Sequence, residues 1–265
     1  MHANPRGCLA FDDEDVARAY VHRPPYPDAL FDFLGDLTVN HRRALDLGCG
    51  PGKIAHRLAS TFDHIDAVDP SAAMLWIADD GRHPNINWIH GFAESADLPG
   101  PYDLVTAGAS IHWMDHSVLF PRLAAMLSEG GVIAVLGGDH AHDVPWDAAW
   151  EAFLQRWLEI LGDEYDPGGY RDAMSRFRSW MDIHGERTFE GSFTQSIDHF
   201  IECQHSRATW SRANLGPDLT AIFDAELREL LSPYANNELI SYTTRAEVVW
   251  GASNPKHSSR YKPAS

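Results

Sequence analysis

One stretch early in the chain, residues 43–54, restricts the possible folds more than any other. Its first residues are mostly apolar and predict a short buried strand over 44–47. Three glycines at alternate positions then let the backbone turn sharply and approach a bound group closely: Gly48, Gly50 and Gly52. The apolar residues from Ile54 onward predict a helix whose free N–H groups point back at this turn.

Glycine-rich turns between a strand and a helix occur in several cofactor-binding motifs, which differ in spacing. A dinucleotide fingerprint has glycine at its first, third and sixth positions, but the sixth position counted from Gly48 is Lys53. A phosphate-binding P-loop has glycine five positions before its Gly-Lys pair and Ser or Thr after it. Leu47 and Ile54 occupy these two positions. The spacing therefore fails both motifs and argues against a nucleotide-dependent oxidoreductase.

The pattern that remains is Asp-x-Gly-x-Gly-x-Gly, with Asp46 at the end of the strand. A carboxylate so close to a helix N-terminus repels a pyrophosphate but attracts an ammonium group, which favours a zwitterionic cofactor with an amino-acid tail. The segment from Asp46 to Gly52 resembles motif I of the class I S-adenosylmethionine-dependent methyltransferases. The resemblance implies an α/β fold: a doubly wound, mostly parallel, seven-stranded Rossmann-like sheet with a helical lid insertion. It also implies S-adenosyl-L-methionine as cofactor and S-adenosyl-L-homocysteine as product.

A second acidic residue has the spacing of a ribose-binding carboxylate. The stretch 64–69 predicts a buried strand that ends at Asp69, 21 residues after Gly48. At this offset a carboxylate at the tip of the second strand accepts hydrogen bonds from both ribose hydroxyls. The glycine turn and this acid together are more specific for a nucleoside cofactor than either is alone.

The resemblance implies further cofactor contacts. Tyr20 and Arg23 match a Tyr-x-x-Arg-Pro segment that covers the cofactor, so Arg23 is expected to pair with the methionyl carboxylate, although a structural proline-rich crossing fits equally well. Met74 either packs against the adenine or belongs to the core, and the loop after strand 86–90 either recognises adenine or is an ordinary acidic surface loop. The expected cofactor-binding residues are Tyr20, Arg23, Asp46, Gly48, Gly50, Gly52, Asp69, Pro70, Met74, Phe92, Ala93, Glu94, Ala109 and Ser110.

The strand predicted over 102–109 runs into a turn with the sequence Ser-Ile-His-Trp at residues 110–113. Ligands gather beyond the carboxyl ends of the strands in open α/β sheets, so this turn is expected to face the transferred methyl group. The turn resembles that of a small-molecule branch of the family that includes trans-aconitate methyltransferase-like proteins. His112 is the candidate catalytic residue, as general base or substrate orienter, and a structural histidine beneath the site is the alternative.

After residue 139 the alternation of strands and helices changes. The new elements are aromatic-rich helices over 146–161 and 168–182, a strand over 187–194 and a helix over 197–210. Such inserts form a lid over the substrate in the resembling family, and aromatic walls suit a small, partly apolar ligand. The alternative arginine clamps for an acidic substrate are Arg171, Arg207 and Arg212. The expected substrate-binding residues are Tyr26, His112, Trp113, Trp150, Arg171 and Trp210.

The patterns divide the chain into five segments. These are an N-terminal helical cap (1–40), the cofactor-binding α/β core (41–139), a lid or substrate-binding insertion with one core strand (140–215), a C-terminal helix and strand that complete the core (216–251), and a flexible tail (252–265). Further helices are expected over 12–20, 30–37, 72–77, 117–127 and 218–231. Gly130 and Gly131 are expected to close the fourth of these helices. The strand over 132–138 is expected to be parallel and the last strand, over 240–250, antiparallel.

Composition restricts location and partners. The 265 residues are 44% hydrophobic and 22% charged, as in globular proteins, and no stretch approaches the ~20 apolar residues of a membrane span. The N-terminus lacks the apolar core of a signal peptide. Three widely spaced cysteines indicate neither a disulfide framework nor a metal site, so the cytoplasm is the expected compartment. A net charge of −17 disfavours nucleic acid as a partner.

Together these features predict an S-adenosylmethionine-dependent methyltransferase that acts on a small molecule. The expected acceptor is an oxygen atom, of a carboxylate or a hydroxyl, methylated by in-line displacement that depends mainly on proximity. Methylation of N, C or S in a metabolite of natural-product biosynthesis, and a non-catalytic cofactor-binding protein, are the alternatives. The sequence leaves the acceptor, the role of His112 and the oligomeric state open.

Overall fold

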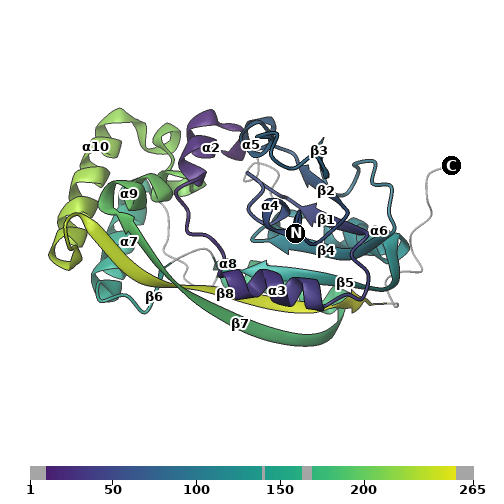
Figure 1. Ribbon diagram of the computed structural model, residues 1–265. Coiled ribbons are helices and arrows are strands. Elements are labelled where there is room, and N and C mark those ends of the chain that lie inside the picture. Colours follow the sequence, from purple (N-terminus) through teal and green to yellow (C-terminus); the bar gives the residue numbers. More distant parts are fainter. Residues whose placement is uncertain (1–9, 139–140, 163–168, 255–265) are drawn as a thin grey trace.

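The computed structural model describes residues 10–138, 141–162 and 169–254, and its centre is one twisted sheet (Figure 1). The described strands are β1 (Arg43–Leu47), β2 (His64–Asp69), β3 (Ile86–His90), β4 (Tyr102–Gly108), β5 (Leu127–Gly137), β6 (Ala141–His142), β7 (Met181–Ser196) and β8 (Leu239–Ser253). They are ordered β3-β2-β1-β4-β5-β8-β6, with β7 also paired to β8. The first five are parallel and β8 is antiparallel to β5. The expected fold class is confirmed, with the two-residue β6 as an additional eighth strand.

Helices connect these strands and cover both faces of the sheet. The α-helices of the described residues are α2 (Glu14–Tyr20), α3 (Asp28–Asp36), α4 (Ala55–Leu58), α5 (Ala72–Ala78), α6 (His116–Met126), α7 (Asp147–Leu161), α8 (Gly169–Ser175), α9 (Ile197–His205) and α10 (Arg212–Leu231). Short 3₁₀ turns are η1 (Ala10–Asp12), η2 (Ile111–Trp113), η3 (Arg176–Trp180), η4 (Ala208–Trp210) and η5 (Ser232–Tyr234). No helix in this part of the chain is both long and apolar enough to cross a membrane.

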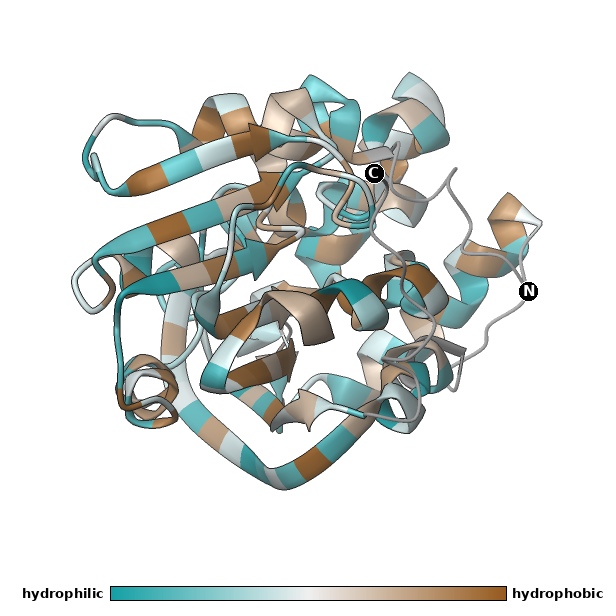
Figure 2. Cartoon of the chain, turned by 90° about the vertical axis from the view of Figure 1, so that its right-hand side faces the viewer, coloured by the Kyte–Doolittle hydropathy of each residue, from teal (hydrophilic) through white to brown (hydrophobic). Residues whose placement is uncertain are grey.

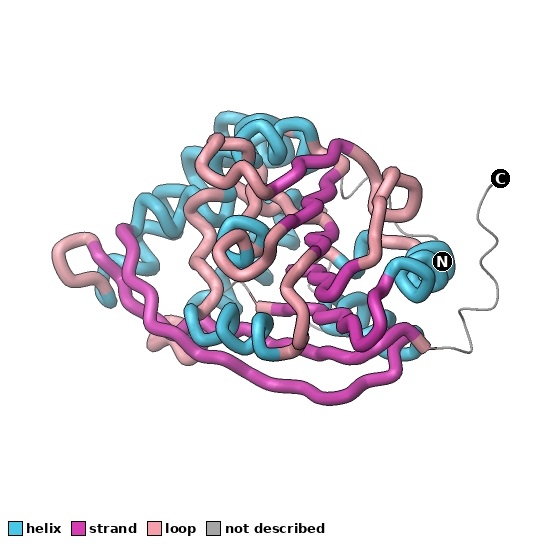
Figure 3. Tube along the Cα trace, turned by 45° about the vertical axis from the view of Figure 1, so that its right-hand side comes forward, coloured by secondary structure: helices cyan, strands magenta, loops and turns pink. Residues whose placement is uncertain are grey.

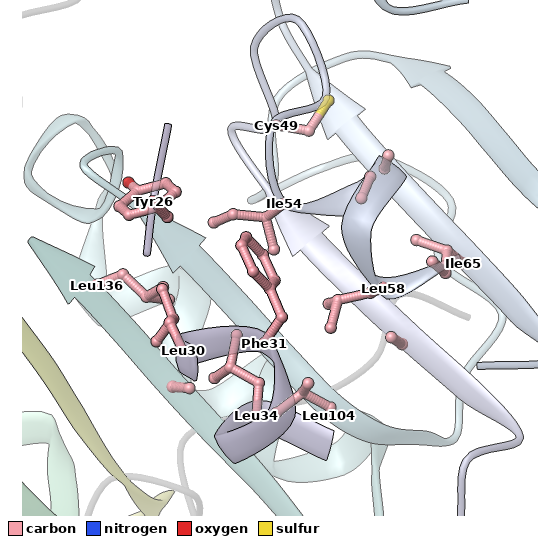
Figure 4. Packing of buried hydrophobic residues seen from close by; sticks show 14 of the residues in the cluster. Tyr26, Leu30, Phe31, Leu34, Cys49, Ile54, Leu58, Ile65, Leu104 and Leu136 are labelled. Carbon is pink, nitrogen blue, oxygen red and sulfur yellow. The ribbon is translucent and has the colours of Figure 1, made fainter. Parts of the chain in front are cut away.

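The apolar residues of the core lie on both faces of the central strands. On one face, Leu30 and Leu34 of α3 are fully buried near β4 and β5, and Leu58 of α4 is fully buried near Ile65 of β2 (Figure 4). On the other face, Leu119 and Leu123 of α6 are also fully buried. Each such side chain stabilises the fold by roughly 1.5–3 kcal/mol. Helices on both faces are what a doubly wound sheet requires.

The hairpin of β7 and β8 extends beyond the central strands. The two strands pair from Met181↔Ser253 to Ser196↔Leu239 and curve away from the parallel part of the sheet (Figure 3). Buried and exposed positions alternate along much of β8, and hydrophobic and hydrophilic residues likewise alternate along the long strands in Figure 2. This period of two is that of a strand with one buried face.

A group of helices lies at the far end of this hairpin. We call α7, α9, η4 and α10 the helical subdomain; its core includes the buried side chains of Trp157, Phe200 and Phe223. Helix α10 therefore packs mainly with helices of the expected 140–215 insertion.

Several element boundaries differ from expectation, among them the strand expected over 187–194, which is the longer β7, and the helix expected over 197–210, which ends at His205. Helix α6 ends at Met126, and Gly130 and Gly131 belong to β5 instead of capping the helix. A Cβ on Gly131 would lie 2.7 Å from the backbone oxygen of Tyr102, so glycine lets β5 approach β4. The helix expected over 168–182 is only α8 followed by η3, because β7 already begins at Met181. The expected tail beyond residue 254 lies outside the described residues.

Two glycines with similar φ angles allow a test of the packing between β5 and β8. Gly138, directly after β5, has φ +88°, and a Cβ there would lie 2.0 Å from the backbone oxygen of Arg245. Gly162, after α7, has φ +76° and open space around its Cα. We expect Gly138→Ala to lower the free energy of unfolding by about 3–5 kcal/mol, because clash and backbone strain add. Gly162→Ala should cost only the strain, about 1–2 kcal/mol. Equal losses in urea denaturation would contradict this packing.

Candidate active site

The glycine turn after β1 forms one wall of a cavity from backbone atoms. Gly48, Gly50 and Gly52 have φ values of +61°, +53° and +80°, in the left-handed region that favours glycine. A Cβ on Gly48 would lie 2.6 Å from the Cβ of Ser110, whose hydroxyl donates a hydrogen bond of 2.6 Å to the Leu47 carbonyl oxygen. The turn is thereby held against the end of β4, and only glycine fits at position 48.

Asp69 lies at the carboxyl end of β2, beside this turn. Its two carboxylate oxygens accept one backbone hydrogen bond each, from the N–H groups of Gly50 and Ser71, both at 2.8 Å. Burial raises the pKa of Asp69, and the two backbone donors oppose this rise. Each carboxylate oxygen has a second lone pair. Asp69 can therefore hold the glycine turn and still accept hydrogen bonds from hydroxyl groups in the cavity.

The cavity has a volume of about 420 Å³ and lies beyond the carboxyl ends of β1, β2 and β4. Every residue expected to contact the cofactor lines it, except Asp46 and Gly52. The lining residues that were not expected to contact the cofactor are Phe11, Val68, Ser95, Gly108, Trp113, Met114, Asp115 and Val118. Of these, Val68 and Gly108 could have been found from their positions near strand ends, and Trp113 was expected at the substrate instead. Phe11 belongs to no recognisable motif.

One side of the cavity is apolar and is formed by β2, α5 and the loop after β3. Val68 and Met74 are each 1% exposed and Ala93 is 5% exposed. The loop is held in place by Arg122, which donates hydrogen bonds to the Ala93 and Ala96 carbonyl oxygens at 2.8 and 2.7 Å. Such a wall suits a flat, weakly polar ring.

The N-terminal segment covers the cavity. The Ser71 hydroxyl donates a hydrogen bond of 2.7 Å to the Phe11 carbonyl oxygen, which ties η1 to the start of α5. The Phe11 ring packs edge-on against Tyr20 and Trp113, with ring centroids 6.3 Å apart in each case. Residues from three separate parts of the chain thus close one side of the cavity.

Arg23 lines the cavity and also holds the helical subdomain. Its Nε donates to the Ser206 hydroxyl at 2.7 Å and its Nη2 to the Ser206 carbonyl oxygen at 2.9 Å. Its guanidinium carbon lies 4.0 Å from the centre of the Tyr20 ring. Arg23 is only 8% exposed. It therefore joins the N-terminal segment to the residues that follow α9.

Asp46 lies behind the cavity wall. It is 1% exposed, and its Oδ1 accepts a hydrogen bond of 2.8 Å from the Thr106 hydroxyl. Its Oδ2 has no hydrogen-bond partner within the described residues, although the Ala55 N–H lies close enough to favour the ionised form. Burial raises the pKa of Asp46 to about 7, although the Thr106 hydroxyl and the Ala55 N–H both lower it. Gly52 also lies outside the cavity, and a Cβ there would meet Trp88 at 2.6 Å.

The residues expected to bind substrate do not form one group. Trp113 lines the first cavity, and His112 lines neither cavity and packs its ring against Trp113 at a centroid distance of 4.5 Å. Tyr26 is 8% exposed and packs in the core near Ile54 (Figure 4). Arg171 is in α8, but its side chain lies outside what the structure describes.

Trp150 and Trp210 line a second cavity, of about 310 Å³, in the helical subdomain. Of the alternative arginine clamps, Arg207 also lines this cavity. Arg212 pairs instead with Glu202 and lines neither cavity.

Comparison with known proteins identifies the family. A family described as a methyltransferase domain matches residues 44–131. A trans-aconitate 2-methyltransferase from Variovorax paradoxus is 31% identical over 195 residues, which cover 68% of this chain and 70% of the relative. Another from Rhizobium etli is 36% identical over 136 residues, so the chain spans only about half (53%) of that relative's length. A solved structure described as a type II methyltransferase from Anaeromyxobacter dehalogenans has 25% identity and a TM-score of 0.68, covering 87% of this chain and 97% of that one.

The fold, the glycine turn and these relatives together define the class. The chain belongs to the class I S-adenosylmethionine-dependent methyltransferases, and the cofactor of this family is S-adenosylmethionine.

Proposed function

We propose that this protein transfers a methyl group from S-adenosylmethionine to an oxygen atom of a small carboxylic acid. The observation that carries the proposal is the 420 Å³ cavity, which combines a backbone wall, a buried carboxylate and an apolar side. Several relatives are named for trans-aconitate, which is itself a carboxylic acid. The net charge of −17 supports a small-molecule acceptor over a nucleic acid.

The residues of the cavity fit the parts of the cofactor. Asp69 would accept hydrogen bonds from the ribose hydroxyls, and the apolar wall with Met74 would hold the adenine ring. The glycine turn admits the cofactor's amino-acid portion close to the backbone, with Arg23 for its carboxylate. Asp46, behind the turn, would supply the negative charge nearest to its ammonium group.

The bound cofactor supplies a methyl group already activated on a sulfonium, so transfer forms a C–O bond while the C–S bond breaks and its electron pair stays on sulfur. The protein's task is to hold the acceptor oxygen in line and to exclude water. Such positioning can lower a barrier by about 7–11 kcal/mol, whereas general-base catalysis contributes roughly 10²–10⁴-fold. A carboxylate is already ionised at neutral pH and needs no base.

His112→Ala is therefore expected to keep most of the activity, with a loss of kcat below about tenfold. The reason is that His112 lies outside both cavities and an acidic acceptor has no proton to lose. Steady-state kinetics across pH 5–9 would measure this. A loss of kcat above about 10²-fold with unchanged KM would instead assign His112 the role of general base.

The proposal is tested by incubating the protein with isotope-labelled cofactor and a pooled set of small acids, phenols and amines. Product mass spectrometry should find the label in acids, as methyl esters that mild alkali removes. Label only in phenols or amines would contradict methylation of a carboxylic acid.

A further inference from the structure

Five aromatic side chains line the second cavity. The rings come from the residues before and within α7, from α9, from η4 and from β8: Trp146, Trp150, Phe200, Trp210 and Tyr242. Some of these rings are nearly perpendicular to one another, with interplanar angles of 90° between Trp146 and Tyr242 and 81° between Phe200 and Tyr242. A flat ligand would meet both ring faces and ring edges, the arrangements that aromatic groups prefer.

Charge is scarce in this wall. Among the described residues that line it, Arg207 is the one cationic side chain and Asp147 the one anionic side chain. Arg207 is half-buried, whereas Asp147 is exposed at the start of α7. A half-buried guanidinium beside aromatic rings suits a ligand with one carboxylate on an apolar body.

We propose that this cavity holds the methyl acceptor and that the acceptor is a monocarboxylic acid with an aromatic body. The proposal rests on the function proposed above and adds the substrate class. A volume of about 310 Å³ is at the lower end of the ~300–1,000 Å³ of small-molecule sites, so one or two rings are the expected size. The acceptor then differs from trans-aconitate, which carries three carboxylates. Two of them would be buried against aromatic rings without a cationic partner, at a high desolvation cost.

The second cavity is a neighbour of the cofactor cavity. Arg23 lines the first cavity and Pro24, the next residue, lines the second. The partner of Arg23 is Ser206, whose hydroxyl donates a hydrogen bond of 2.6 Å to the carbonyl oxygen of Cys203, another residue of the second cavity. Residues 23–24 and the end of α9 thus form a wall that the two cavities share. Methyl transfer would require the acceptor's carboxylate to reach the cofactor past this shared wall.

Three probes separate the possible ligand classes: phenylacetate, its uncharged analogue phenylacetamide, and trans-aconitate. Each is titrated into the full chain without cofactor, by calorimetry and by tryptophan fluorescence. Two variants alter the second cavity, Arg207→Gln and Trp150→Leu. Two matched controls, Arg228→Gln and Trp76→Leu, remove the same groups elsewhere. In the wild type the Arg228 guanidinium pairs with Asp198 and Glu238, and the Trp76 side chain is 80% exposed.

We expect phenylacetate to bind to the wild type and to lose at least tenfold in affinity in each cavity variant, with less than a twofold change in either control. Phenylacetamide should bind more weakly and be insensitive to Arg207→Gln, which separates loss of a charge contact from misfolding. No binding of phenylacetate, binding that neither cavity variant weakens, or tighter Arg207-dependent binding of trans-aconitate would each overturn the proposal. Phenylacetate that binds as expected but gains no methyl group once labelled cofactor is added would support the ligand class and contradict the proposed acid methylation.

Discussion

Asp69→Asn is expected to weaken the binding of S-adenosylhomocysteine by 10²-fold or more. The asparagine keeps the shape of the side chain but cannot offer two ionised acceptors to the ribose, and each hydrogen bond to a charged group contributes about 1.5–3 kcal/mol. Its amide N–H₂ would also face a backbone donor, that of Gly50 or Ser71. Isothermal titration calorimetry measures the loss directly.

The control for this substitution is Asp63→Asn, which removes the same charge from an exposed residue directly before the opposite end of the strand. It should leave the affinity within twofold of the wild type. Melting temperatures of both variants without ligand separate loss of binding from loss of fold. A folded Asp69→Asn variant that binds S-adenosylhomocysteine as tightly as the wild type would exclude Asp69 from ribose recognition.

Asp46 is expected to make the stability of the cofactor-free protein depend on pH. Its pKa is raised by burial to about 7 from an ordinary value near 3.8, so between these values the folded protein binds a proton that the unfolded chain does not. The free energy of unfolding should therefore fall as pH rises from about 4 to about 7 and then level off. The contribution is of the order of 2–4 kcal/mol. Urea denaturation at a series of pH values measures it.

Asp46→Asn should remove this pH dependence and be the more stable protein at pH 8. If Asp46 faces the cofactor's ammonium group in its ionised form, the wild type should bind S-adenosylhomocysteine more tightly as pH rises through about 7, and the variant more weakly than the wild type at pH 8. A variant with the same stability slope as the wild type would show that another group titrates. Unchanged affinity at pH 8 would contradict the role assigned to Asp46.

The central strands and many residues of the first cavity were predictable because local sequence determines them. Strands such as β1, β2 and β4 are short segments that are buried along almost their whole length, and the glycine spacing after β1 together with Asp69 identifies the carboxyl end of the sheet. Contacts made by backbone atoms leave a signature of this kind because few residues other than glycine tolerate them. The residues between Pro70 and Ser110 that line the first cavity were predictable from the same topology, because ligands lie beyond the carboxyl ends of the strands.

The rest depends on contacts between distant parts of the chain. Nothing in the sequence around Phe11 indicates that this residue covers the cavity, because its position depends on the hydrogen bond from Ser71. Gly130 and Gly131 look like a helix cap locally, but the close approach of β4 explains the need for a small residue at Gly131. Whether an aromatic residue after 139 lines a cavity or fills the core of the helical subdomain likewise depends on packing, as Trp150 and Trp157 illustrate.

The most direct test of the account is a crystal structure of the protein with S-adenosylhomocysteine at saturating concentration. The ligand is expected in the cavity beyond β1, β2 and β4, with both ribose hydroxyls hydrogen-bonded to Asp69 and the adenine packed against Met74. A ligand bound elsewhere, or this cavity without ligand density under those conditions, would contradict it.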